Sequence, residues 1–410
     1  MVRMDKKNIC IITQCSLPIP TTKGGAVETL VEYILMENER MDKYHFTVIS
    51  VEDDQAKQQS KQFKNVEFIY VNQSNKLLYR LVFQMYRVLK HMNIYIPFSL
   101  EFKKCLKVLK NIKNQDMFIF EAGPTTQLPA LSKIIPKDKL LVHIHWDGMG
   151  NKRKDKCFSY LIPVSNYIGE QWRKNTGCSK QKIKPLYNCV NIERFDKIIT
   201  EQEKKELKKK LGIPEQNRVI LFTGRIVEEK GVRELLQAFQ QVQYDDVTLL
   251  IIGSANFGSK TNTPYEKEVA KIIEASPRQI IFTGFVHQTK LYKYYNIADI
   301  AVMPSLFQDP APLVCIETQA TGTPLIATRV GGIPEYVTKD SALLIDKDKN
   351  LVNNLADKIN YLLKNPKIME TMGKEAKQNA KSHNTKMYYK RFCELIDGIL
   401  TERLTIKSQV

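Results

Sequence analysis

The chain has 410 residues, 43% of them hydrophobic and 26% charged, which is typical of a soluble globular protein and predicts two domains of about 200 residues each. No apolar run approaches the ~18 residues that span a bilayer, and the N-terminus lacks the apolar core of a secretory signal. The eight scattered cysteines favour neither a disulfide framework nor a zinc site, so a reduced cytoplasmic protein is expected.

The net charge of +18 is concentrated in the first half of the chain. Residues 1–190 hold 30 Lys and Arg against 17 Asp and Glu, whereas residues 191–410 hold 32 against 27. A basic half of this kind can meet nucleic acid, an anionic membrane surface or a phosphate-bearing substrate. A lysine-rich composition without functional meaning is the alternative. No recognised nucleic-acid motif accompanies the charge, so we expect no nucleic-acid partner.

Short apolar strands alternate with helices in the N-terminal half. The predicted elements are strands at 9–13, 46–51, 118–121 and 140–145 and a helix at 25–39. This alternation is typical of a parallel, doubly wound sheet, which binds its ligands at the carboxyl ends of the strands. The Gly24–Gly25 loop and the loop at 143–148 lie at such ends.

Residues 76–113 interrupt the alternation with two basic amphipathic helices. The cations of the first are Lys76, Arg80, Arg87 and Lys90, set among apolar and aromatic residues. The second carries five lysines opposite an apolar face. Helices of this type lie on anionic membrane surfaces or cover an ordinary core with a solvated face. We favour the ordinary core for the second helix, and both interpretations stay open for the first.

A second alternation begins near Asn188 and predicts a second doubly wound domain. The predicted elements are strands at 218–223, 247–253, 279–283 and 300–303 and helices at 201–211, 232–242, 266–275 and 385–404. The expected fold class is therefore α/β, with two doubly wound parallel sheets. The expected boundaries are 1–188 and 189–384, followed by a helix and tail at 385–410.

Residues 304–337 carry the pattern most indicative of a ligand site. Asp309 and Glu317 lie eight positions apart, separated by a proline-containing turn and an apolar run, and a Gly-Gly loop follows. This spacing predicts a loop that leads into a helix N-terminus, where unpaired backbone N–H groups bind anions. Carboxylates on both sides would hold hydroxyl groups, so a sugar attached to a phosphate is the expected ligand.

Arg225 and Lys230 follow a predicted strand and precede a predicted helix. Two cations at this position can neutralise a diphosphate and stabilise it as a leaving group. The alternative is a surface loop in which these charges pair with Glu228 or Glu229.

With these segments the chain resembles the retaining nucleotide-sugar glycosyltransferases of family 4, a bacterial polysaccharide type with the GT-B fold. The resemblance covers nearly the full length. The matching segments are GGAVE, HIHWDG, IPVSNYI, LYNCVNIERF, FTGRIVEEKG, LLIIGS, IIFTGFVHQTKLYKYYNIADIAVMPS, DPAPLVCIE and TGTPLIATRVGGIPEYV. It implies two Rossmann-like domains that face across a cleft, with the acceptor bound by the first and the nucleotide-sugar by the second. It also implies that the C-terminal helix packs back toward the first domain.

The resemblance also implies roles for single residues. Asp309 and Glu317 take the two ends of an E-x7-E motif that binds the donor sugar and the ribose, and Asp309 departs from the usual Glu by one methylene. Pro310 and Pro312 have no N–H, so Leu313 and Val314 are the expected phosphate donors.

The remaining implied positions lie in other loops. Arg225 and Lys230 match the pair that holds the diphosphate. Gly24 and Gly25 match a loop that approaches the phosphates or the acceptor. Val286 and His287 lie where the family holds the base. His145 matches a His that bonds the donor sugar. His143, two positions earlier on a strand, is expected to point to the opposite face.

The implied reaction is sugar transfer with retention at the anomeric carbon, from a nucleoside-diphosphate sugar to a lipid-linked acceptor in bacterial surface polysaccharide synthesis. Arg225 and Lys230 can do the work of a metal ion at the diphosphate, so no metal and no cofactor are expected. A basic segment at 76–113 would suit the inner face of the cell membrane. The alternatives are a GT-B phosphorylase or epimerase and a catalytically inactive subunit that binds and stabilises a partner glycosyltransferase.

Overall fold

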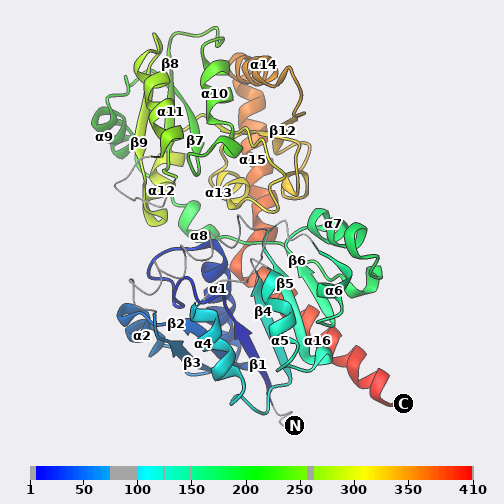
Figure 1. Cartoon of the computed structure of the whole chain (residues 1–410). Helices are drawn as coiled ribbons and strands as arrows, with labels where there is room; N and C mark the ends of the chain where they lie inside the picture. The colour runs from blue at the N-terminus through cyan, green and yellow to red at the C-terminus, as the bar shows by residue number, and fades with distance from the viewer. Residues whose placement is uncertain (1–5, 74–99, 123–124, 147–149, 256–262, 409–410) are drawn as a thin grey trace. The chain divides into compact units, whose positions relative to one another are not determined.

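The structure, a computed structural model, divides into two compact units, each built around a parallel sheet (Figure 1). The first unit combines Met1–Asn188 with Thr385–Val410, and the second is Cys189–Asn384. The residues described are 6–73, 100–122, 125–146, 150–255 and 263–408.

The sheet of the first unit has six parallel strands in the order β3-β2-β1-β4-β5-β6. Its strands are β1 (Lys7–Ile12), β2 (Tyr44–Val51), β3 (Val66–Val71), β4 (Met117–Ala122), β5 (Leu140–Ile144) and β6 (Tyr160–Pro163). Ile9 of β1 pairs with Phe46 of β2 on one side and with Met117 of β4 on the other. The direction of the strand order therefore reverses between β1 and β4, which is where such sheets bind ligands.

Helices cover this sheet, including one from the far end of the chain. They are α1 (Ala26–Met41), α2 (Asp54–Ser60), α4 (Leu100–Leu109), α5 (Leu128–Leu131), α6 (Lys152–Asp155), α7 (Asn166–Thr176) and α16 (Thr385–Ser408). The ring of Phe392 on α16 packs edge-on against Tyr44, with centroids 6.3 Å apart, and the Tyr44 hydroxyl donates to Asp397 at 2.7 Å. The helix at 385–408 thus completes the core of the first unit.

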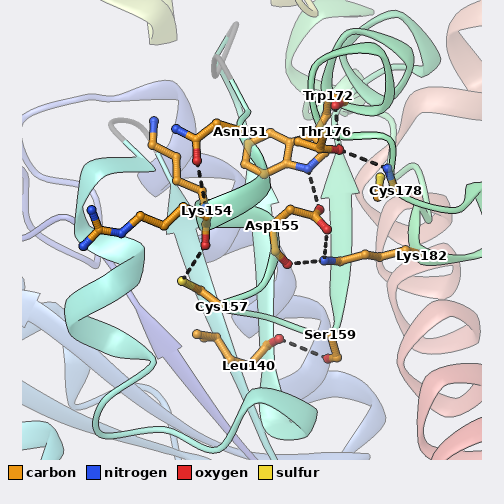
Figure 2. A network of polar contacts seen from close by, with 11 residues as sticks. Leu140, Asn151, Lys154, Asp155, Cys157, Ser159, Trp172, Thr176, Cys178 and Lys182 are labelled. Carbon is orange, nitrogen blue, oxygen red and sulfur yellow. Dashed lines mark hydrogen bonds and ion pairs between the residues drawn. The ribbon is translucent and has the colours of Figure 1, made fainter.

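A buried polar network fixes the segment between β5 and β6 (Figure 2). The indole N–H of Trp172 on α7 donates to Asp155 on α6 at 2.8 Å, and Lys182 forms an ion pair with Asp155 at 2.9 Å. A Cβ at Gly150 would lie 2.6 Å from the Trp172 ring, so the backbone there packs directly on the indole. These contacts anchor the far end of the loop that follows β5.

The described part of the basic segment is α4. Phe102, Cys105 and Leu109 are buried, and the Phe102 ring lies 5.8 Å from that of Phe120 on β4. Lys103, Lys107 and Lys110 are exposed. The second amphipathic helix therefore covers the core with a solvated lysine face, as favoured above. The first helix, at 76–92, lies outside the described residues.

The second unit repeats the architecture with the strand order β12-β11-β10-β7-β8-β9. Its strands are β7 (Arg218–Thr223), β8 (Val247–Ile252), β9 (Ile280–Gly284), β10 (Ile300–Met303), β11 (Leu325–Thr328) and β12 (Ala342–Ile345). All the pairings are parallel, and the order reverses between β7 and β10. The predicted α/β class with two doubly wound sheets is confirmed.

The helices of the second unit begin and end at residues suited to those positions. They are α8 (Ile192–Phe195), α9 (Glu201–Leu211), α10 (Val232–Phe239), α11 (Pro264–Glu274), α12 (Gln288–Tyr295), α13 (Leu313–Thr321), α14 (Leu351–Lys364) and α15 (Pro366–Ala380). Thr200 and Glu203 form a capping box at the start of α9, which ends at Gly212 in the left-handed conformation. The two ends of the unit meet, because the Val190 N–H donates to the His383 carbonyl at 3.0 Å.

Candidate functional site

Three loops of the second unit meet at the carboxyl ends of β7, β10 and β11. A Cβ at Gly231 would lie 2.0 Å from the Pro304 carbonyl oxygen, and one at Gly331 would lie 2.2 Å from the Asp309 carbonyl oxygen. Both glycines have positive φ angles of 71° and 56°. Since any side chain at either position would overlap backbone, the loops are held together by direct backbone packing.

Lys230 and Asp309 form an ion pair at this junction. Lys230 Nζ lies 2.5 Å from Asp309 Oδ2, and the two side chains are only 17% and 7% exposed. The ammonium also lies 4.7 Å from the centre of the Phe307 ring. The surface-loop alternative, in which Lys230 pairs with Glu228 or Glu229, therefore does not hold.

Arg225 is the second cation of this loop region. It follows β7 and is half-buried. Its guanidinium makes no hydrogen bond or ion pair with any residue that the structure describes. Arg225 thus keeps its donors available to an incoming anion, whereas Lys230 already faces a carboxylate.

The N-terminus of α13 lies directly after Asp309. Pro312 occupies the N-cap position, and no side chain caps the helix. The Leu313 and Val314 N–H groups precede the first intrahelical donors and have no acceptor among the described residues. Two free N–H groups at the positive end of a helix suit a phosphate oxygen.

Glu317 lies one turn further along α13 and is 5% exposed. Burial raises the pKa of its carboxyl to about 7, although hydrogen bonds from Gln288 and Tyr295 act in the opposite direction. Gln288 donates to one oxygen at 3.3 Å and the Tyr295 hydroxyl to the other at 3.4 Å. The Tyr295 hydroxyl is itself 2.8 Å from Thr223 Oγ1 at the end of β7. These long contacts leave capacity for a hydroxyl-bearing ligand.

Val286 and His287 line a surface hollow of about 490 Å³ beside β9, together with Phe285, Lys290 and Tyr294. Phe285 is 45% exposed. The His287 ring caps α12 through Thr289, so its Nδ1 is already engaged. The hollow therefore offers an aromatic surface to a ligand, whereas the His287 side chain caps the start of α12.

In the first unit, Gly24 and Gly25 precede α1 and have positive φ angles of 78° and 112°. Gly25 is the N-cap of the helix, and a Cβ there would lie 2.2 Å from Glu28 Oε2. Glu28 is 7% exposed, and burial raises the pKa of its carboxyl to about 7. The backbone at Gly24 and Gly25 therefore disfavours any residue with a side chain, and the buried Glu28 carboxyl lies against Gly25.

His143 and His145 approach the same carboxylate, that of Glu121 at the end of β4. His145 Nε2 lies 2.6 Å and His143 Nδ1 3.0 Å from Glu121 Oε2. The prediction that the two rings point to opposite faces is wrong. Side chains two positions apart along a strand point to the same face, so the alternation places His143 on the side of His145, which directly follows β5.

Four contacts of the candidate site were missed from the sequence: Glu121, Gln288, Tyr295 and Phe307. Glu121 had one available signal, because it is the last residue of a predicted strand and strand ends carry ligand-binding groups. The other three residues reach the site only when the chain folds, and nothing in their local sequence identifies them as site residues.

Comparisons with known proteins agree with this architecture. Residues 203–379 match the family model of glycosyl transferases group 1. Spore coat protein SA of Bacillus subtilis is 24% identical over 388 residues, which is 92% of this chain and 95% of that protein. The lipopolysaccharide 1,2-N-acetylglucosaminetransferase of Salmonella typhimurium is 25% identical over 205 residues, covering 49% of this chain and 52% of that enzyme.

The fold also matches solved structures. The structure of Anabaena HepE in complex with UDP-glucose superposes with a TM-score of 0.71 at 18% identity, covering 95% of this chain and 99% of HepE. The chain therefore has the GT-B fold. The residues that match the family model, 203–379, lie within the second unit. Among the described residues, none of the helices combines the length and hydropathy needed to cross a membrane.

Proposed function

We propose that the chain is a retaining family 4 glycosyltransferase that moves a sugar from a nucleoside-diphosphate sugar to an acceptor hydroxyl. One observation carries the proposal. Lys230 lies on the loop after β7, and the free N–H groups and the buried Glu317 lie on α13 after β10, where the strand order of the second unit reverses. The cation and the helix N-terminus match the diphosphate of such a donor, and the carboxylate matches its hydroxyl groups.

Each group has a distinct role in this proposal. Arg225 and Lys230 neutralise the diphosphate, and the Leu313 and Val314 N–H groups hold its oxygens. Glu317 accepts hydrogen bonds from the ribose, and Asp309 contacts the sugar once the diphosphate competes for Lys230. The hollow at Val286 and His287 holds the base.

The proposed reaction is a front-face displacement. The bond between the anomeric carbon and the β-phosphate oxygen breaks, and the acceptor oxygen bonds to that carbon on the same face. The departing phosphate takes the proton of the acceptor hydroxyl. Arg225 and Lys230 stabilise the developing negative charge, so we propose transfer without a metal ion. For Gly24, Gly25 and His145, contact with the donor or the acceptor stays a prediction of the resemblance.

Binding of a nucleotide-sugar is expected to raise the melting temperature of the protein. A ligand at 100 times its Kd that binds only the folded state adds about 2.7 kcal/mol to the free energy of unfolding. UDP-, GDP- and ADP-sugars are compared by thermal shift, starting with UDP-glucose because HepE binds it. A protein that no nucleotide-sugar stabilises, and that releases no nucleotide with any acceptor, would contradict the proposal.

For the acceptor, we propose a lipid-linked saccharide of a bacterial surface polysaccharide, reached at the inner face of the cell membrane. The excess of basic residues lies in the first half of the chain, which includes residues 76–113. The similar Salmonella enzyme is named for transfer to lipopolysaccharide. Both observations support an anionic, lipid-bearing acceptor.

The chain is expected to float with phosphatidylglycerol vesicles at low salt and to be released at about 1 M salt, because screening weakens surface charge attraction. Replacing Lys76, Arg80, Arg87 and Lys90 by glutamine should abolish flotation. The matched control replaces three exposed lysines, Lys103 and Lys107 of α4 and Lys110 directly after it, and should retain most of the flotation. Absence of flotation in the unaltered chain would count against a membrane-bound acceptor.

A further inference from the structure

A buried cluster of three titratable side chains lies at the carboxyl ends of β4 and β5. The side chains of Glu121, His143 and His145 are 1%, 3% and 9% exposed. Both rings approach a single atom, Glu121 Oε2, and their centroids lie 4.1 Å apart. The cluster includes the His that the resemblance places near the reacting sugar, so its protonation matters for function.

These three residue types can also bind a metal ion, and the relevant atoms lie within 4.8 Å of one another. The distances favour hydrogen bonds. Atoms that share one tetrahedral zinc ion at 2.0–2.1 Å lie roughly 3.3 Å apart. Nε2 of His145 lies only 2.6 Å from Glu121 Oε2, the length of a charge-assisted hydrogen bond.

The hydrogen bonds define where the protons lie. An ionised carboxylate only accepts, so His145 Nε2 and His143 Nδ1 each carry a hydrogen. Burial alone would raise the pKa of Glu121, but its interactions with His143 and His145 outweigh burial and hold this pKa low. Burial lowers the pKa of His145. The pair is therefore a carboxylate and a neutral imidazole.

His143 fits the same assignment. Its Nε2 is buried and has no hydrogen-bond partner among the described residues. A proton on this nitrogen would have no acceptor and would incur the desolvation penalty of a buried, unpaired donor. The ring therefore carries its proton on Nδ1 and serves as a second donor that holds the Glu121 carboxylate in place.

We propose that Glu121 is a positioning residue that locks His145 in the Nε2–H tautomer. The Nδ1 of His145 then carries a lone pair and has no partner within the described part of the chain. It can accept a hydrogen bond from a hydroxyl group but cannot donate one to a phosphate or ring oxygen. This inference rests on the proposed function and specifies what His145 binds there: the O–H of a sugar.

The tautomer can be read directly by long-range ¹H–¹⁵N NMR of the full-length, ¹⁵N-histidine-labelled chain at pH 7, without ligand. The His145 resonances are assigned by their loss in His145→Gln. We expect a protonated Nε2 and a bare Nδ1. In Glu121→Gln and Glu121→Leu, the Nδ1–H form should gain population, because no carboxylate selects the tautomer. Glu37→Gln, which removes another buried carboxyl of the same unit, is the matched control and should leave the tautomer unchanged.

Activity supplies a second readout. With a nucleotide-sugar identified by thermal shift, Glu121→Gln should lower kcat about 10- to 100-fold and leave KM nearly unchanged. The reason is that a wrongly oriented His145 impairs the orientation of the sugar for reaction more than the binding of the donor. If the chain transfers no sugar at all, the proposed function fails, whereas the spectrum of the ligand-free chain still decides the tautomer.

Three outcomes would overturn the inference. The first is a bare Nε2 or a doubly protonated His145 in the unaltered chain at pH 7. The second is a tautomer that stays the same in both Glu121 variants while circular dichroism shows them folded. The third is one equivalent of tightly bound metal ion that is lost in His143→Gln, since the three side chains would then be its ligands.

Discussion

Replacing Lys230 by methionine is expected to lower kcat for sugar transfer by about 100- to 1,000-fold, because one charge-stabilising donor at a leaving group typically contributes that much. Methionine keeps the length of the side chain and its packing on Phe307, so the change removes mainly the ammonium group. The measurement is steady-state release of the nucleoside diphosphate. Lys267→Met, on the exposed face of α11, is the matched control and should behave like the unaltered chain.

The single replacement has a second effect that must be separated from the first. It leaves the Asp309 carboxylate, only 7% exposed, without its cation. An uncompensated buried charge destabilises a fold by several kcal/mol, so the melting temperature should fall. In the double variant Lys230→Met/Asp309→Asn, the melting temperature should recover and the activity should not. A double variant with normal kcat would show that Lys230 supports only the fold.

Replacing Glu317 by glutamine is expected to weaken nucleotide-sugar binding about 10- to 100-fold, because hydrogen bonds to a charged group contribute about 1.5–3 kcal/mol. Ligand hydroxyls donate to the ionised carboxylate, so binding by the unaltered chain should tighten as the pH rises through about 7. The glutamine variant should lose this dependence. Thermal shift with UDP-glucose at pH 6 and pH 8 measures both effects, and Glu274→Gln on α11 is the matched control.

The ligand-free protein gives an independent check of the same carboxyl group. Its pKa in the fold, about 7, lies above its ordinary value of 4.5, because burial disfavours the charge. The stability that Glu317 contributes is therefore fully present below pH 4.5 and is lost as the pH rises through 7. At pH 8 the loss reaches about 3 kcal/mol. Glu317→Gln should then melt above the unaltered chain at pH 8 and near it at pH 5, and equal melting at both would contradict the assignment.

The sequence predicted the class of fold because period and length of the apolar segments are local properties. Strands β1, β2, β4 and β5 and β7–β10 all lie where predicted to within a few residues. Strands β3, β6, β11 and β12 were not predicted, and three of them, β3, β6 and β12, lie at sheet edges. Strands β6, β11 and β12 have only four residues each, which is too few to show a clear apolar period.

For the candidate site as well, the sequence predicted the local features and missed the contacts between distant residues. The spacing of Asp309 and Glu317 correctly predicted a loop leading into a helix, since α13 begins at Leu313. Their surroundings were not predictable from spacing. The ion pair of Asp309 with Lys230 joins residues 79 positions apart, and the contact of Tyr295 with Glu317 depends on how α12 packs on α13. The His143 prediction failed because side chains two positions apart in a strand share a face.

The hydrogen bond between Val190 and His383 has a consequence for the conformational entropy of folding. The first unit is made of two segments of chain that are separated by the whole of Cys189–Asn384. Closing a disordered loop of that length costs entropy that rises with the logarithm of its length. Once the second unit has folded, this hydrogen bond holds the Val190 nitrogen 3.0 Å from the His383 carbonyl oxygen. The two segments of the first unit then continue from neighbouring residues, so α16 no longer has to close a long disordered loop. Folding of the inserted second unit therefore lowers the entropy cost of packing α16 against β2.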